Sequence, residues 1–231
     1  MNMKVKVRIL ELIAVLDLAF LLFLGQMYAA GGPAAPVSSG DEEAVIHRGY
    51  VALTFDDGPD RECTEDLLDG LKNRGVKASF FLMGQNIEGN EDLVLRMKEE
   101  GHLVGNHSYS HLLLTKADSR AVCQAVDRTS RLIQEITGQE PQYIRPPYGE
   151  WNEELDCTLA LTPVFWTVDS LDWKLKDRAQ IVDRVLKDVE DGDIILMHDI
   201  YPQSVEAALE IVDRLSAGGY TFVTADELLI D

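Results

Sequence analysis

Two histidines four residues apart, His107 and His111, are the first residues whose type and spacing suggest chemistry. If a helical turn begins at His107, both rings lie on one face and offer two imidazole nitrogens to one cation. A catalytic zinc ion needs a third protein ligand, which Asp57 can supply from a separate part of the chain. The sequence therefore predicts a hydrolytic metal site of Asp57, His107 and His111, with Zn²⁺ as the ion and Co²⁺ as a substitute.

A candidate general base directly precedes the third ligand. Asp56 and Asp57 stand where an apolar run gives way to Gly58-Pro59, and this turn allows both carboxylates to face one pocket. One carboxylate can then bind the metal while the other, Asp56, takes a proton from the attacking water. Arg145 is the natural partner to orient Asp56 and keep it ionised, because a nearby guanidinium lowers the pKa of a carboxyl group.

His198 is the candidate general acid. A leaving amine or alkoxide needs a proton, and His198 directly follows an apolar run at 193–197. Asp172 would stabilise the imidazolium of His198 and raise its pKa. The two remaining histidines, His47 and His102, fit surface residues or hydrogen-bonded core residues.

The elements that must position these residues alternate between strands and helices. Between helical patterns, in which apolar residues stand three and four apart, seven short apolar runs predict strands at 50–55, 78–83, 103–106, 142–145, 163–168, 193–197 and 220–223. Such alternation implies parallel strands joined by right-handed crossovers, in either an open doubly wound sheet or a barrel. Both folds bring the carboxyl ends of their strands to one face, where the candidate residues stand.

Each of these features has an ordinary structural explanation when taken alone. Asp-Asp-Gly-Pro makes a good turn, two histidines can be surface residues, and Asp172-Trp173 can be a helix cap followed by a core aromatic residue. Their joint occurrence at five strand ends that share one predicted face favours a functional site.

Taken together and in this order, five motifs resemble those of the polysaccharide deacetylase family, also called the NodB homology domain or carbohydrate esterase family 4. They are Thr-Phe-Asp-Asp-Gly-Pro (54–59), His-Ser-x-x-His (107–111), Arg-Pro-Pro-Tyr (145–148), Asp-Trp (172–173) and Leu-Met-His (196–198). The resemblance covers about residues 49–231. It implies an α/β fold, a distorted barrel of seven parallel strands, which agrees with the seven apolar runs.

The resemblance also implies a role for each matching residue. Asp56 is the base and Asp57, His107 and His111 are the metal ligands, while Arg145 orients the base and Asp172 supports the acid His198. Three further residues are implied in substrate binding: the backbone N–H of Tyr148 at the oxyanion, Trp173 as a wall of the substrate groove, and Leu196.

The leading functional hypothesis is a metal-dependent hydrolase that removes N-acetyl groups from N-acetylglucosamine in peptidoglycan or a related cell-wall polysaccharide and releases acetate. An O-acetyl esterase acting on acetylxylan, or a chitooligosaccharide deacetylase, would use the same site. A hypothesis from another class is a wall-glycan-binding module without turnover. Release of acetate distinguishes an enzyme from a binding module.

The N-terminus has the order of an export signal. Lys4, Lys6 and Arg8 precede an apolar run at 9–24, but Glu11 and Asp17 interrupt the run and disfavour a stable membrane span. A cleaved signal peptide, a membrane anchor and an amphipathic surface helix all stay open. We therefore expect an extracytoplasmic, cell-wall-associated protein, either membrane-anchored or secreted, with a signal or anchor at 1–30, a flexible Gly/Pro/Ser-rich tether at 31–46 and a catalytic domain at 47–231.

Composition limits the remaining classes. The 231 residues are 46% hydrophobic, which suits one globular domain with a short extension and argues against a polytopic membrane protein. Forty Asp and Glu against 21 Lys and Arg give a net charge of −19, which would repel nucleic acid. Cys63, Cys123 and Cys157 form no Cys-x-x-Cys pair and fit free thiols, although one pair could bridge in an oxidising compartment. Nothing in the sequence indicates an oligomeric state.

Overall fold

The computed structural model describes residues 47–151 and 161–229, and residues 46–231 form one compact unit. The predicted signal or anchor at 1–30 and the predicted tether at 31–46 lie outside the described residues and stay predictions. Among the described residues, no helix is long and apolar enough to cross a membrane.

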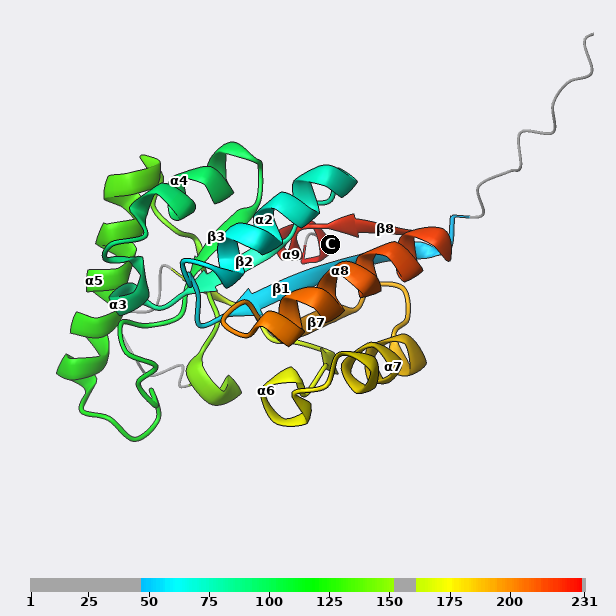
Figure 1. The fold of residues 1–231 in the computed structure, drawn as a ribbon. Helices are drawn as coiled ribbons and strands as arrows, with labels where there is room; N and C mark the ends of the chain where they lie inside the picture. The colour runs from blue at the N-terminus through cyan, green and yellow to red at the C-terminus, as the bar shows by residue number, and fades with distance from the viewer. Residues whose placement is uncertain (1–46, 152–160, 230–231) are drawn as a thin grey trace, which may run out of the picture. The chain divides into compact units, whose positions relative to one another are not determined.

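An eight-stranded sheet in which every pairing is parallel forms the centre of the described unit (Figure 1). Its order is β5-β4-β3-β2-β1-β7-β6, and β8 pairs with the first half of β1, where β2 no longer reaches. The strands are β1 (Gly49–Asp56), β2 (Ser79–Leu82), β3 (Leu103–Asn106), β4 (Tyr143–Ile144), β5 (Thr162–Pro163), β6 (Val168–Asp169), β7 (Ile194–His198) and β8 (Tyr220–Val223).

Helices cover the outside of this sheet, and α8 lies between α2 and α7 (Figure 1). Asp118 and Asp177 accept hydrogen bonds from the first free N–H groups of α5 and α7, which explains where these two helices begin. The helices are α2 (Cys63–Arg74), α3 (Gly84–Ile87), α4 (Glu91–Glu99), α5 (Ser119–Thr137), α6 (Asp172–Leu175), α7 (Arg178–Asp188), α8 (Pro202–Ala217) and α9 (Ala225–Leu228), with a 3₁₀ turn, η1, at Pro147–Gly149.

Side chains of β1 alternate between two cores. Val51, Leu53 and Phe55 belong to the main core with the covering helices, whereas Ala52 belongs to a smaller inner cluster with Phe81 and Ile194. Because side chains alternate along a strand, Thr54 and Asp56 continue the inner row that Ala52 begins. The sheet therefore directs Asp56 inward at the carboxyl end of its central strand.

The predicted fold class is confirmed as a curled sheet of parallel strands, but the single strand expected at 163–168 is wrong. This run contains two short strands, β5 and β6, and the chain between them crosses from one edge of the sheet to the other. Val164 N–H donates to Ile144 O of β4 (2.8 Å), and Thr167 N–H donates to Ile194 O of β7 (3.0 Å). A continuous apolar run looks the same in sequence whether it pairs along one strand or passes between two.

The cysteine prediction is partly wrong. Cys63 is a buried free thiol, as expected, and burial together with the nearby Asp60 raises its pKa to about 11. Cys123, however, is disulfide-bonded. The sequence could not show this, because spacing along the chain gives no information about the distance between two cysteines in the fold. Cys157 lies outside the described residues.

Candidate active site

A cavity of about 430 Å³ opens at the carboxyl ends of the central strands. Every site residue expected from the sequence lines this cavity except Arg145 and Asp172, which are fully buried behind it. The lining residues are Asp56, Asp57, His107, His111, Tyr148, Trp166, Asp169, Trp173, Leu196 and His198.

The predicted metal ligands converge in this cavity. Asp57 Oδ1 lies 3.4 Å from His107 Nε2 and 3.7 Å from His111 Nε2, and one ligand atom from each of the three residues lies within 4.8 Å of the others. No helical turn begins at His107, because residues 108–110 form a turn in which Ser108 has a positive φ of 61°. Asp57 and His111 are also left-handed, with φ of 74° and 55°. The turn brings the two rings together as a helix would have done, with centroids 4.9 Å apart.

These residues fit a bound divalent cation. Asp57 Oδ1 is buried without a hydrogen-bond partner among the described residues, as a metal ligand would be before it binds the ion. His107 Nδ1 donates to Arg145 O (2.7 Å), which leaves Nε2 directed toward Asp57. Burial and the neighbouring His107 lower the pKa of His111, which favours the neutral ring that coordinates metals. Burial opposes ionisation of Asp57, but the neighbouring histidines lower its pKa.

Arg145 holds Asp56, the predicted base, at the floor of the cavity. Arg145 Nη1 donates to Asp56 Oδ1 at 3.0 Å and to Thr54 Oγ1 at 2.6 Å. Its other nitrogens donate to Val164 O (3.2 Å) and Phe165 O (3.3 Å). The second oxygen of Asp56, Oδ2, stays close to the metal set, 3.8 Å from His107 Nε2. The arrangement fixes a carboxylate beside the ligands without placing it among them.

His198, the predicted acid, pairs in register with Asp56 from the neighbouring strand β7, and its Nε2 lies 4.0 Å from Asp57 Oδ2. Its Nδ1 donates to Asp172 Oδ1 (2.8 Å), and its backbone N–H donates to Asp172 Oδ2 (2.8 Å). Burial lowers the pKa of His198, but the hydrogen bond and charge of Asp172, with the charges of Asp56 and Asp57, raise it to about 9. His198 is therefore a proton donor at neutral pH.

The three residues implied in substrate binding surround the same cavity. Tyr148 has a left-handed backbone (φ 62°), its ring contacts that of His111 at 4.4 Å, and it is 64% exposed. Trp173 is 47% exposed, whereas Leu196 is buried on the inner row. Two exposed aromatic rings at a cavity mouth suit the apolar faces of sugar rings.

Sequence reasoning missed two residues of the cavity, Trp166 and Asp169. Trp166 lies on the segment that crosses between β5 and β6, and it was hidden because this segment was expected to be the interior of one strand. Asp169 had a usable signal, since it ends a predicted strand as the other candidates do, but its role was not predicted.

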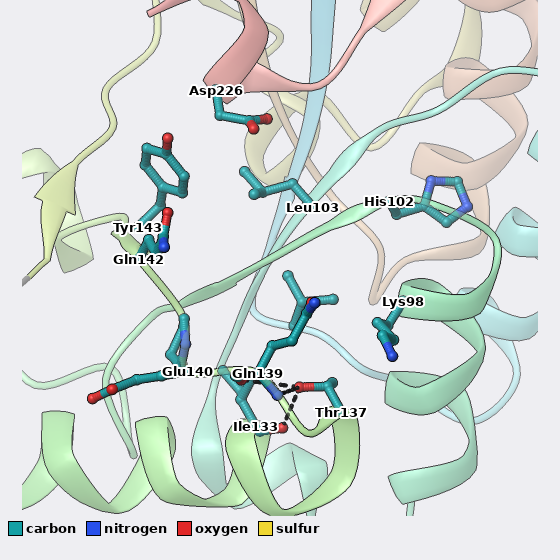
Figure 2. A pocket seen from close by; sticks show the side chains of 12 residues that line it. Lys98, His102, Leu103, Ile133, Thr137, Gln139, Glu140, Gln142, Tyr143 and Asp226 are labelled. Atoms are coloured by element: carbon teal, nitrogen blue, oxygen red, sulfur yellow. Dashed lines mark hydrogen bonds between the residues drawn. The ribbon is translucent and has the colours of Figure 1, made fainter.

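A second, larger cavity of about 510 Å³ holds none of the predicted site residues (Figure 2). It lies at the amino ends of β3 and β4, where Leu103 and Tyr143 line it. His102, also in its lining, accepts a hydrogen bond from Ala78 N–H through Nδ1 (3.0 Å), and burial lowers its pKa to about 4. His102 is therefore a neutral core histidine, as expected from the sequence.

Comparison with known proteins agrees with this geometry. Residues 45–162 match the model of the polysaccharide deacetylase family. The peptidoglycan-N-acetylmuramic acid deacetylase PdaC of Bacillus subtilis is 42% identical over 178 residues, which cover 77% of this chain and 38% of PdaC. The peptidoglycan-N-acetylglucosamine deacetylase PgdA of Listeria monocytogenes is 40% identical, with the same coverage. This chain thus spans about two fifths of the length of these relatives.

Solved structures show the same fold. The structure of PdaC from Bacillus subtilis matches with a TM-score of 0.76 and 41% identity, over 79% of this chain and 90% of that chain. A family 4 acetyl xylan esterase from Clostridium thermocellum, in complex with a cobalt ion, matches with a TM-score of 0.73 and 35% identity, over 78% of this chain and 90% of that chain.

The metal site generates a first prediction. His107→Ala should weaken zinc binding at least about 100-fold, because it removes a ligand whose other ring nitrogen is already fixed by Arg145 O. Equilibrium dialysis with metal analysis measures the loss, and His47→Ala, at an exposed histidine outside the cavity, is the matched control. Equal zinc affinity in the two variants would contradict the ligand set.

The acid generates a second prediction. In metal-free protein, His198 should titrate near pH 9, because Asp172 outweighs the effect of burial. In Asp172→Asn the charge of this partner is lost while burial and the charges of Asp56 and Asp57 remain, so the pKa should fall from its wild-type value. NMR titration of the histidine rings measures both values, and His102 is the internal reference. A His198 pKa that does not fall in Asp172→Asn would remove Asp172 from this role.

Proposed function

Because this chain belongs to the polysaccharide deacetylase family, we propose that it is a metal-dependent hydrolase that removes N-acetyl groups from N-acetylglucosamine in peptidoglycan or a related cell-wall polysaccharide. Hydrolysis breaks the amide C–N bond and releases acetate and a free amine. The observation that carries the proposal is the meeting of a metal set, a base and an acid in one cavity. Asp56 Oδ2 lies 3.8 Å from His107 Nε2, and His198 Nε2 lies 4.0 Å from Asp57 Oδ2.

The reaction divides among the residues as follows. A zinc ion bound by Asp57, His107 and His111 would act as a Lewis acid and lower the pKa of water to about 7. Asp56 removes a proton from the water that attacks the acetyl carbon, and Arg145 pairs with Asp56 and orients it. The backbone N–H of Tyr148 binds the oxygen that becomes negative.

Collapse of the tetrahedral intermediate needs a proton on the leaving nitrogen. His198 supplies this proton from Nε2, the ring atom on the side of the metal set. Asp172 holds the other nitrogen of the ring and keeps the imidazole protonated before the step. Proton removal and proton donation are therefore assigned to two different residues, Asp56 and His198.

Three observations support a cell-wall substrate outside the cytoplasm. PdaC and PgdA are named as peptidoglycan deacetylases, of N-acetylmuramic acid and N-acetylglucosamine respectively. Cys123 is disulfide-bonded, and disulfides persist in oxidising compartments. The residues before the domain have the pattern of a signal peptide or membrane anchor. We propose a protein that is exported, and then either anchored at the membrane or secreted.

The same site would serve an O-acetyl esterase, and the similarity to a solved acetyl xylan esterase is the observation that favours this second candidate. The bond broken would then be an ester, whose alkoxide leaving group needs the same proton from His198. Acetate release from peptidoglycan, chitooligosaccharide and acetylxylan in parallel separates the two activities. A protein that binds these glycans and releases no acetate would be a wall-binding module.

A third prediction concerns the base and the acid. Asp56→Asn and His198→Ala should each lower the rate of acetate release from peptidoglycan by about 10² to 10⁴, since each removes a proton transfer. Zinc should stay bound in both variants, and chelation should abolish wild-type activity until zinc or cobalt is restored. Full activity in a verified metal-free sample would reject the mechanism. Loss of zinc from Asp56→Asn would mean that the two aspartates have exchanged roles.

A fourth prediction concerns location. Cell fractionation should recover the protein from the membrane or the medium, and deletion of its gene should leave wall muropeptides more acetylated on glucosamine. The physical reason is reach, because the roughly 20 residues between Leu24 and the domain span about 25 Å as a flexible chain and would hold an anchored domain against the inner wall. Soluble cytosolic protein together with unaltered muropeptides would reject both the localisation and the peptidoglycan substrate, and would leave the metal chemistry unaffected.

A further inference from the structure

Asp169 is a carboxylate of the catalytic cavity to which neither the metal set nor the two proton transfers assign a role. It ends β6, where it pairs in register with Leu196 of β7. Leu196 and His198 both line the cavity from alternate positions of β7, so the pairing directs Asp169 to the same side. Asp169 and Trp173 thus both belong to the wall of the cavity.

The protein holds this carboxylate rigidly without satisfying it. Asp169 Oδ1 accepts a hydrogen bond from Leu171 N–H (2.9 Å), and its main-chain oxygen accepts one from Arg184 Nε (2.6 Å). Among the described residues no side chain donates to the carboxylate and no cation pairs with it. Asp169 is partly exposed and lines the cavity. A fixed acceptor therefore faces the space in which the substrate binds.

The other carboxylates near the cavity differ from Asp169 in having a partner or a place in the metal set. Asp56 is paired with Arg145, Asp172 is paired with His198, and Asp57 belongs to the metal set. Asp169 is the remaining carboxylate of the cavity, and it lacks a cationic partner. A free sugar hydroxyl can donate to it, whereas a second carboxylate close by would be repelled.

The two N-acetylated sugars of peptidoglycan differ in this chemistry. N-acetylglucosamine has a free hydroxyl group at O3, whereas in N-acetylmuramic acid a lactyl group blocks O3 and ends in a free carboxyl group wherever the stem peptide has been removed. We propose that Asp169 is a substrate-binding residue that accepts a hydrogen bond from a sugar hydroxyl and selects N-acetylglucosamine units over N-acetylmuramic acid units. The inference rests on the proposed function, and it adds the residue that determines which sugar is used.

The experiment compares wild type with Asp169→Asn and Asp169→Ser. Asn keeps an acceptor for Leu171 N–H and removes the charge, and Ser keeps a short acceptor and removes the carboxylate. Asp188→Asn, at an exposed carboxylate that does not line the cavity, is the matched control. Zinc-loaded full-length protein acts on glycan strands stripped of stem peptides, and mass spectrometry of the products counts deacetylated units of each sugar.

Wild type and Asp188→Asn should deacetylate glucosamine units at least about tenfold faster than muramic acid units, and Asp169→Asn should reduce this ratio about tenfold. Asp169→Ser should raise KM for chitotetraose about tenfold or more, with a smaller change in kcat. A wild type that prefers muramic acid units, or Asp169 variants with unchanged ratio and KM, would overturn the inference.

Calorimetric titration of chitotetraose separates this inference from the proposed function. Asp169→Ser should weaken binding about tenfold or more relative to Asp188→Asn, whether or not acetate is released. If Asp169→Ser weakens binding and the wild type releases no acetate, the hydrolase is rejected and the role of Asp169 is supported. Unchanged binding in an active enzyme would reject the role of Asp169 and leave the hydrolase standing.

Discussion

The buried guanidinium of Arg145 is the constraint around which the catalytic end of the sheet is built. A charged group with no exposed surface is tolerated only where a counter-charge and hydrogen-bond acceptors replace water. Asp56 provides the counter-charge, Thr54 and two main-chain carbonyls provide further acceptors, and the ring of Phe81 lies 4.3 Å from the guanidinium carbon. Leaving such a group without its partner typically costs about 3 to 5 kcal/mol. The base is therefore held in place by the same interactions that make burial of Arg145 tolerable.

The same residue connects the fold to the metal ligands. Its side chain binds the carbonyl groups of Val164 and Phe165, which lie on the segment that crosses between the two edges of the sheet. Its main-chain oxygen accepts a hydrogen bond from His107 Nδ1 and so determines which ring nitrogen faces Asp57. Because one residue contacts the base, a ligand and the crossing segment, these three parts cannot move independently. Because Arg145 contacts both Asp56 and His107, it holds these two side chains in a fixed position relative to each other.

Sequence patterns predicted the site better than they predicted the path of the chain. Residues such as Asp57 and His198 were found because parallel strands bring their carboxyl ends together whatever the details of the loops. The break between β5 and β6 was not found, since it depends on which neighbour Val164 and Thr167 bond, and both belong to one apolar run. Cys123 and Trp166 were misjudged for the same reason, because their environments are made by contacts distant in sequence. The left-handed turn at Ser108 gave the expected convergence by a different local geometry.

The proposed acid and base require opposite protonation states at one pH in one cavity, and the structure gives each of them its own partner. Asp56 is bonded to a guanidinium that stays charged at any working pH, so it is supported as a proton acceptor. His198 is bonded to Asp172, which raises its pKa to about 9, so it stays a proton donor near neutrality. Without Asp172 the histidine would lose the partner that keeps it protonated, and without Arg145 the aspartate would lose the partner that orients it. The separate pairing of Asp56 with Arg145 and of His198 with Asp172 is therefore as necessary to the proposed chemistry as the proposed metal ligands themselves.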